Sequence, residues 1–213
     1  MKYVSIMIVS FGLLVGSAMA QDDTGSGSAN MFFGLKAGAN YSNVYDTDGE
    51  EFTADSKIGF AGGLFLTIPI GEFIGVQPEI LYSQRGFTGK GRLLGLPYEL
   101  ERTSNFVDIP LFVSIKPIEY ISIVAGPQFS FLVNQKDQFK NGVTTIEQEQ
   151  DFENDNIRKN TVCLVGGLDI NVQHLVIGAR VGADLIKNDG DGNSSTPRYK
   201  NTWGQLTVGY RLY

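Results

Sequence analysis

The charged residues that are best placed to do chemistry lie at alternate positions within otherwise apolar stretches. Seven of them carry both signs: Lys36, Glu79, Asp108, Asp169, Arg180, Asp184 and Arg211. Alternate positions share one face of a β-strand, and charges enclosed by a narrow barrel are costly unless they pair. We therefore expect the four carboxylates to pair with the three cations in a network that plugs a lumen. The competing interpretation is a solvated outer face.

A single histidine limits the catalytic possibilities. Enzymes that cut or transfer acyl chains commonly combine Ser and His with a carboxylate. His174 is the only histidine and falls in a short turn between two alternating stretches, where an exposed, non-catalytic histidine is the usual interpretation. We therefore predict no enzymatic activity and assign no catalytic residue.

Metal and cofactor motifs are weak in this sequence. The acidic stretches at 46–51 and 189–193 could bind calcium, but neither has the ligand spacing of an EF-hand loop. Cys163 is the only cysteine, so it can form neither an internal disulfide nor the usual thiolate zinc site. We predict no cofactor and no resident metal, and we interpret both acidic stretches as solvated loops.

The N-terminus has the layout of a secretory signal peptide over 1–20. Lys2 precedes an apolar run, and small residues end at Ala20. Residues 21–30 are polar and rich in Gly and Ser, so we expect a flexible linker before one domain over 31–213. Cleavage after Ala20 would remove Lys2 and change the net charge from −6 to −7. This negative charge argues against a nucleic-acid partner. No later stretch is apolar for long enough to form a membrane-spanning helix.

Eight stretches alternate apolar and polar residues, the period of half-buried strands. They cover residues 31–42, 57–70, 73–85, 103–116, 120–134, 161–172, 175–186 and 202–213. Short turns alternate with long polar loops at 43–56, 86–102, 135–160 and 187–201. This arrangement is typical of bacterial outer-membrane barrels. It predicts an all-β fold, an eight-stranded antiparallel up-and-down transmembrane β-barrel.

Glycines and aromatic residues favour a membrane barrel over a soluble barrel with its apolar face inward. Many glycines lie on the polar face, where a narrow lumen leaves little room for side chains. Aromatic residues near strand ends predict girdles at the two membrane interfaces. They are Phe32, Phe33, Tyr41, Phe73, Tyr82, Phe106, Tyr120, Trp203, Tyr210 and Tyr213.

Several short motifs, in this order and spacing, resemble one protein family. They are GLKAG at 34–38, QPEILYSQRG at 77–86, VDIPL at 107–111, AGPQ at 125–128 and GYRLY at 209–213. The chain resembles the PorT-like small outer-membrane β-barrel proteins of Gram-negative Bacteroidota. The resemblance implies an eight-stranded barrel of the OmpA/OmpX kind, usually without an assigned enzymatic role.

The sequence therefore predicts a non-enzymatic integral protein of the cell outer membrane. Its expected role is envelope structure or interaction through the four long loops. The expected partners are outer-membrane lipid and an extracellular or envelope protein, and we expect a monomer. Three alternatives stay open: a small porin-like channel, an outer-membrane lipid-modifying enzyme, and a soluble periplasmic β-barrel binding protein.

Overall fold

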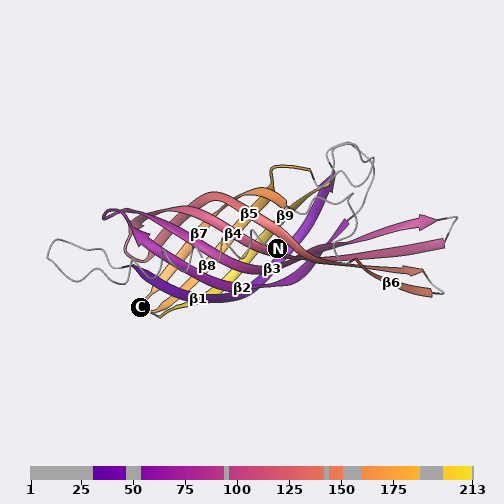
Figure 1. Cartoon of the computed structure of the whole chain (residues 1–213), viewed down its shortest axis with the longest axis horizontal. Helices are drawn as coiled ribbons and strands as arrows, with labels where there is room; N and C mark the ends of the chain where they lie inside the picture. Colours follow the sequence, from indigo (N-terminus) through magenta and orange to yellow (C-terminus); the bar gives the residue numbers. More distant parts are fainter. Residues whose placement is uncertain are drawn as a thin grey trace, which may run out of the picture.

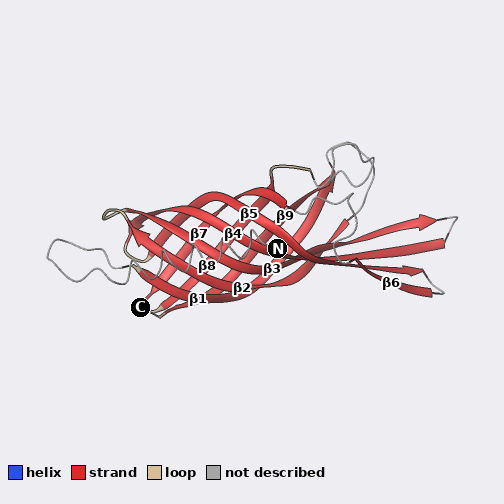
Figure 2. Cartoon of the chain, viewed as in Figure 1, coloured by secondary structure: helices blue, strands red, loops and turns tan. Residues whose placement is uncertain are grey.

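The computed structural model describes residues 31–46, 54–93, 96–141, 144–150, 160–187 and 199–212, and this part of the chain is built of strands (Figure 2). The predicted signal peptide at 1–20 and linker at 21–30 lie outside the described residues. The strands are β1 (Phe32–Asp46), β2 (Ala54–Pro69), β3 (Ile74–Leu93), β4 (Leu96–Ile118), β5 (Ile121–Asn141), β6 (Thr144–Gln150), β7 (Asn160–Val172), β8 (Leu175–Asp184) and β9 (Tyr199–Arg211).

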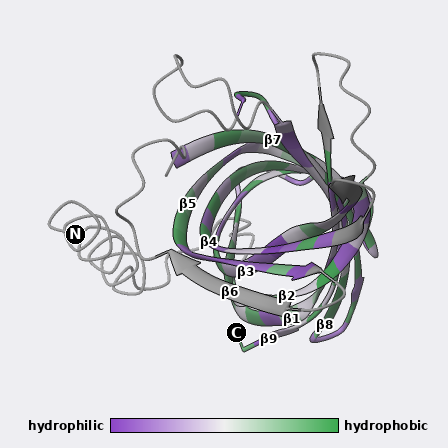
Figure 3. Cartoon of the chain, turned by 90° about the vertical axis from the view of Figure 1, so that its right-hand side faces the viewer, coloured by the Kyte–Doolittle hydropathy of each residue, from purple (hydrophilic) through white to green (hydrophobic). Residues whose placement is uncertain are grey.

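Eight of these strands close into a barrel, as the sequence predicted. Neighbours are antiparallel in the order β4-β3-β2-β1-β9-β8-β7-β5, and the pairing of β4 with β5 completes the ring (Figure 3). The first and last strands pair directly, with Gly34 opposite Arg211. β6 stands apart from the ring, and within the described residues it pairs only with β5.

The apolar side chains face outward and the polar side chains face inward. Val181 and Leu206 are 68% and 66% exposed, whereas Glu79 and Arg85, on the opposite face of the wall, are 2% and 1% exposed. Bands of apolar and polar residues alternate along the strands (Figure 3). A soluble barrel requires the reverse arrangement, so the alternative of a soluble periplasmic barrel is wrong.

Short turns join the strands at one end of the barrel. They span residues 70–73, 119–120 and 173–174, and the second begins beyond the predicted strand end at 116 because β4 continues to Ile118. In the last turn, Gln173 has a φ of 51°, in the left-handed region that two-residue hairpin turns require. We call this end, where β1 begins and β9 ends, the short-turn end. Among the described residues no helix is long and apolar enough to span a membrane.

The opposite end carries strand extensions in place of two predicted loops. β3 and β4 stay paired as far as Leu93 and Leu96, and β5 runs on to Asn141 before β6 returns along it (Figure 1). The predictions of loops at 86–102 and 135–160 are therefore wrong over these strands. Both stretches are polar and lack the apolar face that identified the other strands. Parts of 43–56 and 187–201 lie outside the described residues.

Two large aromatic side chains fill the lumen where a glycine lies opposite. Phe65 on β2 faces Gly34 on β1, and Trp203 on β9 faces Gly182 on β8. A Cβ added at Gly34 would lie 2.5 Å from the Phe65 ring, and one at Gly182 would overlap the Trp203 ring. The girdle prediction is thus wrong for Trp203 and Phe106, which are both 5% exposed and point inward. It is also wrong for Phe32, which pairs with the inward-facing Thr67.

We predict that Gly182→Ala destabilises the barrel and that Gly166→Ala does not. The added methyl at position 182 would displace Trp203, and overpacking of this kind typically costs about 1–3 kcal/mol. At Gly166 the nearest atom to a new Cβ would be the Val124 carbonyl oxygen at 3.7 Å. The measurement is the temperature at which the protein, heated in detergent before electrophoresis, changes from the gel mobility of the folded barrel to that of the unfolded chain. Equal conversion temperatures for the two variants would contradict this account of the lumen.

Candidate functional site

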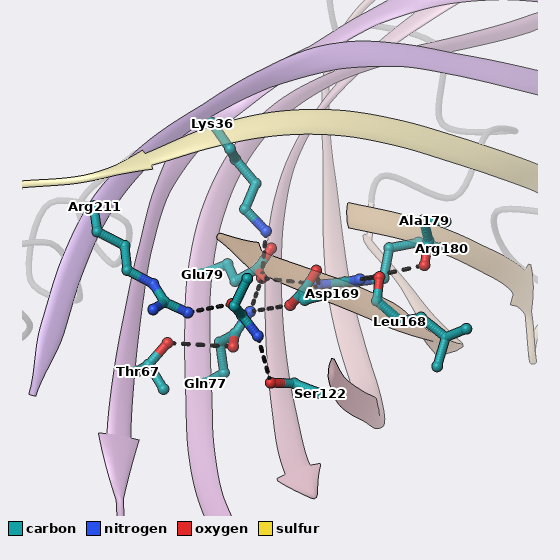
Figure 4. Close-up of polar contacts among 11 residues, drawn as sticks. Lys36, Thr67, Gln77, Glu79, Ser122, Leu168, Asp169, Ala179, Arg180 and Arg211 are labelled. Atoms are coloured by element: carbon teal, nitrogen blue, oxygen red, sulfur yellow. Dashed lines mark hydrogen bonds and ion pairs between the residues drawn. The ribbon is translucent and has the colours of Figure 1, made fainter. Parts of the chain in front are cut away.

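A cluster of ion pairs fills the lumen toward the short-turn end (Figure 4). Lys36 Nζ lies 2.6 Å from Glu79 Oε1, and Arg180 Nη2 lies 2.7 Å from Asp169. The Gln77 amide donates to Glu79 at 2.8 Å and to Asp169 at 3.2 Å, and therefore joins the two pairs. These residues come from β1, β3, β7 and β8, so the cluster crosses the barrel.

Aromatic rings and carbonyl groups complete the surroundings of the two cations in this cluster. Lys36 Nζ lies 5.1 Å from the centre of the Phe65 ring, and Arg180 lies 5.4 Å from the Phe112 ring. Arg180 Nη1 also donates to the Leu168 carbonyl at 2.9 Å. Cations gain energy from such ring faces when water is excluded. The lumen therefore compensates its buried charge with rings as well as carboxylates.

A second ion pair, between Arg85 and Asp108, lies against the only tryptophan of the chain. Both side chains are 1% exposed. The Arg85 guanidinium lies 3.7 Å from the centre of the Trp203 ring and 4.9 Å from that of Phe106. Arg85 was absent from the predicted network, although its position on the polar face of β3 could have indicated an inward side chain.

Two other members of the predicted network have neutral partners instead of charged ones. Asp184 accepts hydrogen bonds from the Cys163 thiol at 3.1 Å and from the Asn201 side-chain amide at 2.6 Å. Arg211 donates to the Asn171 side-chain oxygen. The structure thus places all seven predicted residues on the lumen side. It joins Lys36, Glu79, Asp169 and Arg180 in one cluster, and leaves Asp108, Asp184 and Arg211 with other partners.

An arginine links the strand extensions to the barrel wall. Arg102 on β4 donates from Nε and Nη2 to the two carboxylate oxygens of Asp137 on β5, at 2.8 and 2.6 Å. Its Nη1 donates to the Tyr199 hydroxyl on β9 at 2.7 Å. Tyr199 packs on Phe87 and Val44 in a small buried cluster. Sequence reasoning missed these residues because Phe87 and Arg102 fell in a predicted loop.

The charged clusters close the middle of the lumen. Asp108, Asp169 and Arg180 are at most 4% exposed, close to the core residues Phe112 and Val124, so water reaches almost none of their surface. The lumen of an eight-stranded barrel is just wide enough for side chains to fill. The interior of this barrel is therefore a packed polar core rather than an open pore.

The described residues offer no assembled metal site. They contain no group of three His, Cys, Asp or Glu side chains placed to hold a metal ion. Of the two acidic stretches, 189–193 and all of 46–51 except Asp46 lie outside the described part of the chain. The His174 ring stacks on Tyr210 with 5.6 Å between ring centres, in an exposed turn at the short-turn end.

Comparison with known families decides the class of this barrel. Residues 19–187 match the outer membrane protein beta-barrel domain family. The chain belongs to this family. It is accordingly a protein of the outer membrane, and short turns of such barrels face the periplasm while the opposite end faces the exterior.

Several solved outer-membrane proteins align with this family member over most of their length. Ail, the attachment invasion locus protein of Yersinia pestis, is 15% identical, with 85% of this chain and 98% of Ail covered and a TM-score of 0.46. Neisserial surface protein A is 10% identical, with coverages of 84% and 97% and a TM-score of 0.47. OprG from Pseudomonas aeruginosa is 12% identical, with coverages of 86% and 94% and a TM-score of 0.40. No curated protein matches the chain.

We predict that Asp108→Asn destabilises this outer-membrane barrel more than the double variant Arg85→Met/Asp108→Asn does. Removal of one partner of a buried ion pair leaves an uncompensated charge and typically costs about 3–5 kcal/mol. Removal of both charges avoids that cost. Urea unfolding in lipid vesicles, followed by the fluorescence of Trp203, measures the difference. A double variant less stable than Asp108→Asn would contradict the predicted coupling.

Proposed function

We propose that this protein is a non-enzymatic binding platform anchored in the outer membrane by its barrel. The observation that carries the proposal is the set of strand extensions at the exterior end (Figure 1). There β3, β4, β5 and β6 form one continuous antiparallel sheet beyond the barrel. An interaction surface raised on a rigid barrel suits recognition of a macromolecule better than chemistry on a small molecule.

The outer surface of this projecting sheet is polar. Lys57 and Lys140 both pair with Glu101, at 2.7 and 3.4 Å, and Lys90 pairs with Asp55 at 2.6 Å. The hydrogen bond from Lys57 holds the pKa of the Glu101 carboxyl below its ordinary value. Where side chains of the extensions are described, none is a large apolar residue with an exposed surface. A partner would therefore bind through polar contacts.

The edge of the projecting sheet supplies a second means of recognition. β6 pairs on one side with β5 and, among the described residues, with nothing on its other side. An edge strand presents unpaired backbone N–H and C=O groups, and an extended segment of another protein can add to it as a further strand. We propose an extracellular or envelope protein with such a segment as the partner. The barrel itself acts as a monomer surrounded by lipid.

Within its family we place the chain near the PorT-like proteins of Bacteroidota. The QPEILYSQRG motif at 77–86 supports this placement because it supplies Gln77 and Glu79 to one buried cluster and Arg85 to the other. The proposal carries no role in protein secretion, because no residue described here bears on that process.

Two alternatives from the sequence receive less support. A channel needs an open lumen, and the buried pairs of Arg85 and Arg180 occupy it. A lipid-modifying enzyme of the Ser–His kind needs a histidine at the exterior end, whereas His174 lies at the periplasmic end. Unchanged lipid A mass spectra after deletion of the gene would agree with a non-enzymatic protein.

Photo-crosslinking in living cells tests the proposed platform. A photoreactive amino acid is placed at Lys90, Lys140 or Thr145 in the extensions, and at the lipid-facing Leu206 as a matched control. We expect discrete protein adducts from the extension positions and no protein adduct from Leu206. Adducts at Leu206 alone, or none at any extension position, would refute the proposal.

Planar bilayer recordings test the closed lumen. We expect the purified protein to show no stepwise conductance at moderate voltage, because the paired side chains block the path of ions. Stable openings that change in size in the Arg180→Ala variant would establish the channel alternative instead.

A further inference from the structure

Positive charge exceeds negative charge in the lumen near the periplasmic mouth. Among the described residues, the inward-facing cations at this end are Lys36, Lys116, Arg180 and Arg211, and the inward-facing carboxylates are Glu79 and Asp169. Lys36 and Arg180 neutralise the two carboxylates. Lys116 and Arg211 remain as an excess of two positive charges.

These two cations meet at one aromatic ring. The Arg211 guanidinium lies 5.0 Å from the centre of the Phe32 ring, and Lys116 Nζ lies 5.9 Å from it. Because both lie within 6 Å of one ring centre, the two charges are at most about 11 Å apart and repel each other. Neither forms an ion pair with a carboxylate of the described chain. The inward-facing carboxylate of Asp169 is already bound to Arg180.

The pair also has hydrogen-bond donors that the described chain does not use. Arg211 Nη2 donates to Asn171, whereas the Arg211 Nε is buried and has no acceptor among the described groups. No described group accepts a hydrogen bond from Lys116 Nζ. Buried donors without acceptors are costly. Two like charges at close range add to that cost, because the barrel wall and the ring screen them less than water does.

We propose that Lys116 and Arg211 form an oxyanion site at the periplasmic mouth of the lumen, which takes a phosphate group. A guanidinium fork and an ammonium group are the donors that bind phosphate best in proteins. A phosphate dianion would neutralise the excess charge and accept from the free Nε. The phosphate could come from the aqueous periplasm or from an anionic lipid headgroup, since exposed aromatic residues of the neighbouring turns, Phe73 and Tyr120, mark the interface at this level.

Arginine side-chain NMR tests the site with inorganic phosphate as the probe. The full barrel is held in a phosphate-free maltoside detergent, and the Nε–Hε resonances of its arginines are followed during the titration. We expect a saturable shift of the Arg211 resonance. The apparent affinity should fall at least tenfold in Lys116→Gln. Lys90→Gln, which removes an exposed lysine at the other end, should leave it unchanged.

The source of the phosphate is separated by a second preparation in lipid nanodiscs. With a lipid headgroup as the ligand, discs that contain phosphatidylglycerol hold the Arg211 resonance at its bound position before any phosphate is added. With free phosphate as the ligand, the titration is the same in discs with and without that lipid.

Either of two results would overturn the site. The first is a shift that does not saturate, and the second is an equal loss of affinity in Lys116→Gln and Lys90→Gln. All variants are first checked for the heat-dependent gel shift of the folded barrel. Lys116→Gln is suited to this comparison, because it removes a partly exposed side chain that has no ion pair within the described chain.

Discussion

The whole structure depends on one constraint, which is that the wall of the barrel presents its apolar side chains to lipid. Because strand side chains alternate, an apolar exterior puts the polar set into a lumen from which water is nearly excluded. Each charge there needs a partner within the protein, and Lys36, Glu79, Asp169 and Arg180 supply one another. The lumen is therefore organised as a core, with ion pairs in the place that apolar contacts take in soluble proteins.

The same constraint explains why rings and glycines accompany the charges. Arg85 lies over Trp203, and Trp203 in turn fits against the wall only because Gly182 has no side chain. At the exterior end Arg102 continues this pattern with Asp137, Tyr199 and Phe87, and fixes the base of the projecting sheet to β9. The barrel and the projecting sheet are thus joined by packed side chains into one unit.

The positions of the strands and the outward direction of their apolar side chains could be predicted from the sequence, because alternation of apolar residues is a local signal. The strand extensions could not be predicted in this way, since residues 86–102 show no apolar face and contain several glycines. The pairing of charged side chains across strands could not be predicted from single strands either. Which carboxylate meets Arg85 depends on the relative shift of β3 and β4 around the barrel, and no pattern within one strand encodes that shift. Trp203 and Phe106 were assigned to the wrong face because they were judged by residue type, although the outward-facing Leu206 and Leu111 in the same strands put them on the lumen face by alternation.

The pairing of β1 with β9 has a consequence for the way this protein is made. The first and last strands of the barrel form the seam of the ring, so the ring stays open until β9 has been made. Until then the edges of the first and last strands carry unsatisfied hydrogen-bonding groups, which would be costly in lipid and prone to wrong association in water. Contacts so distant in sequence also form slowly. Assembly therefore favours a barrel whose strands have all been made before insertion, and removal of β9 would abolish the barrel rather than shorten it.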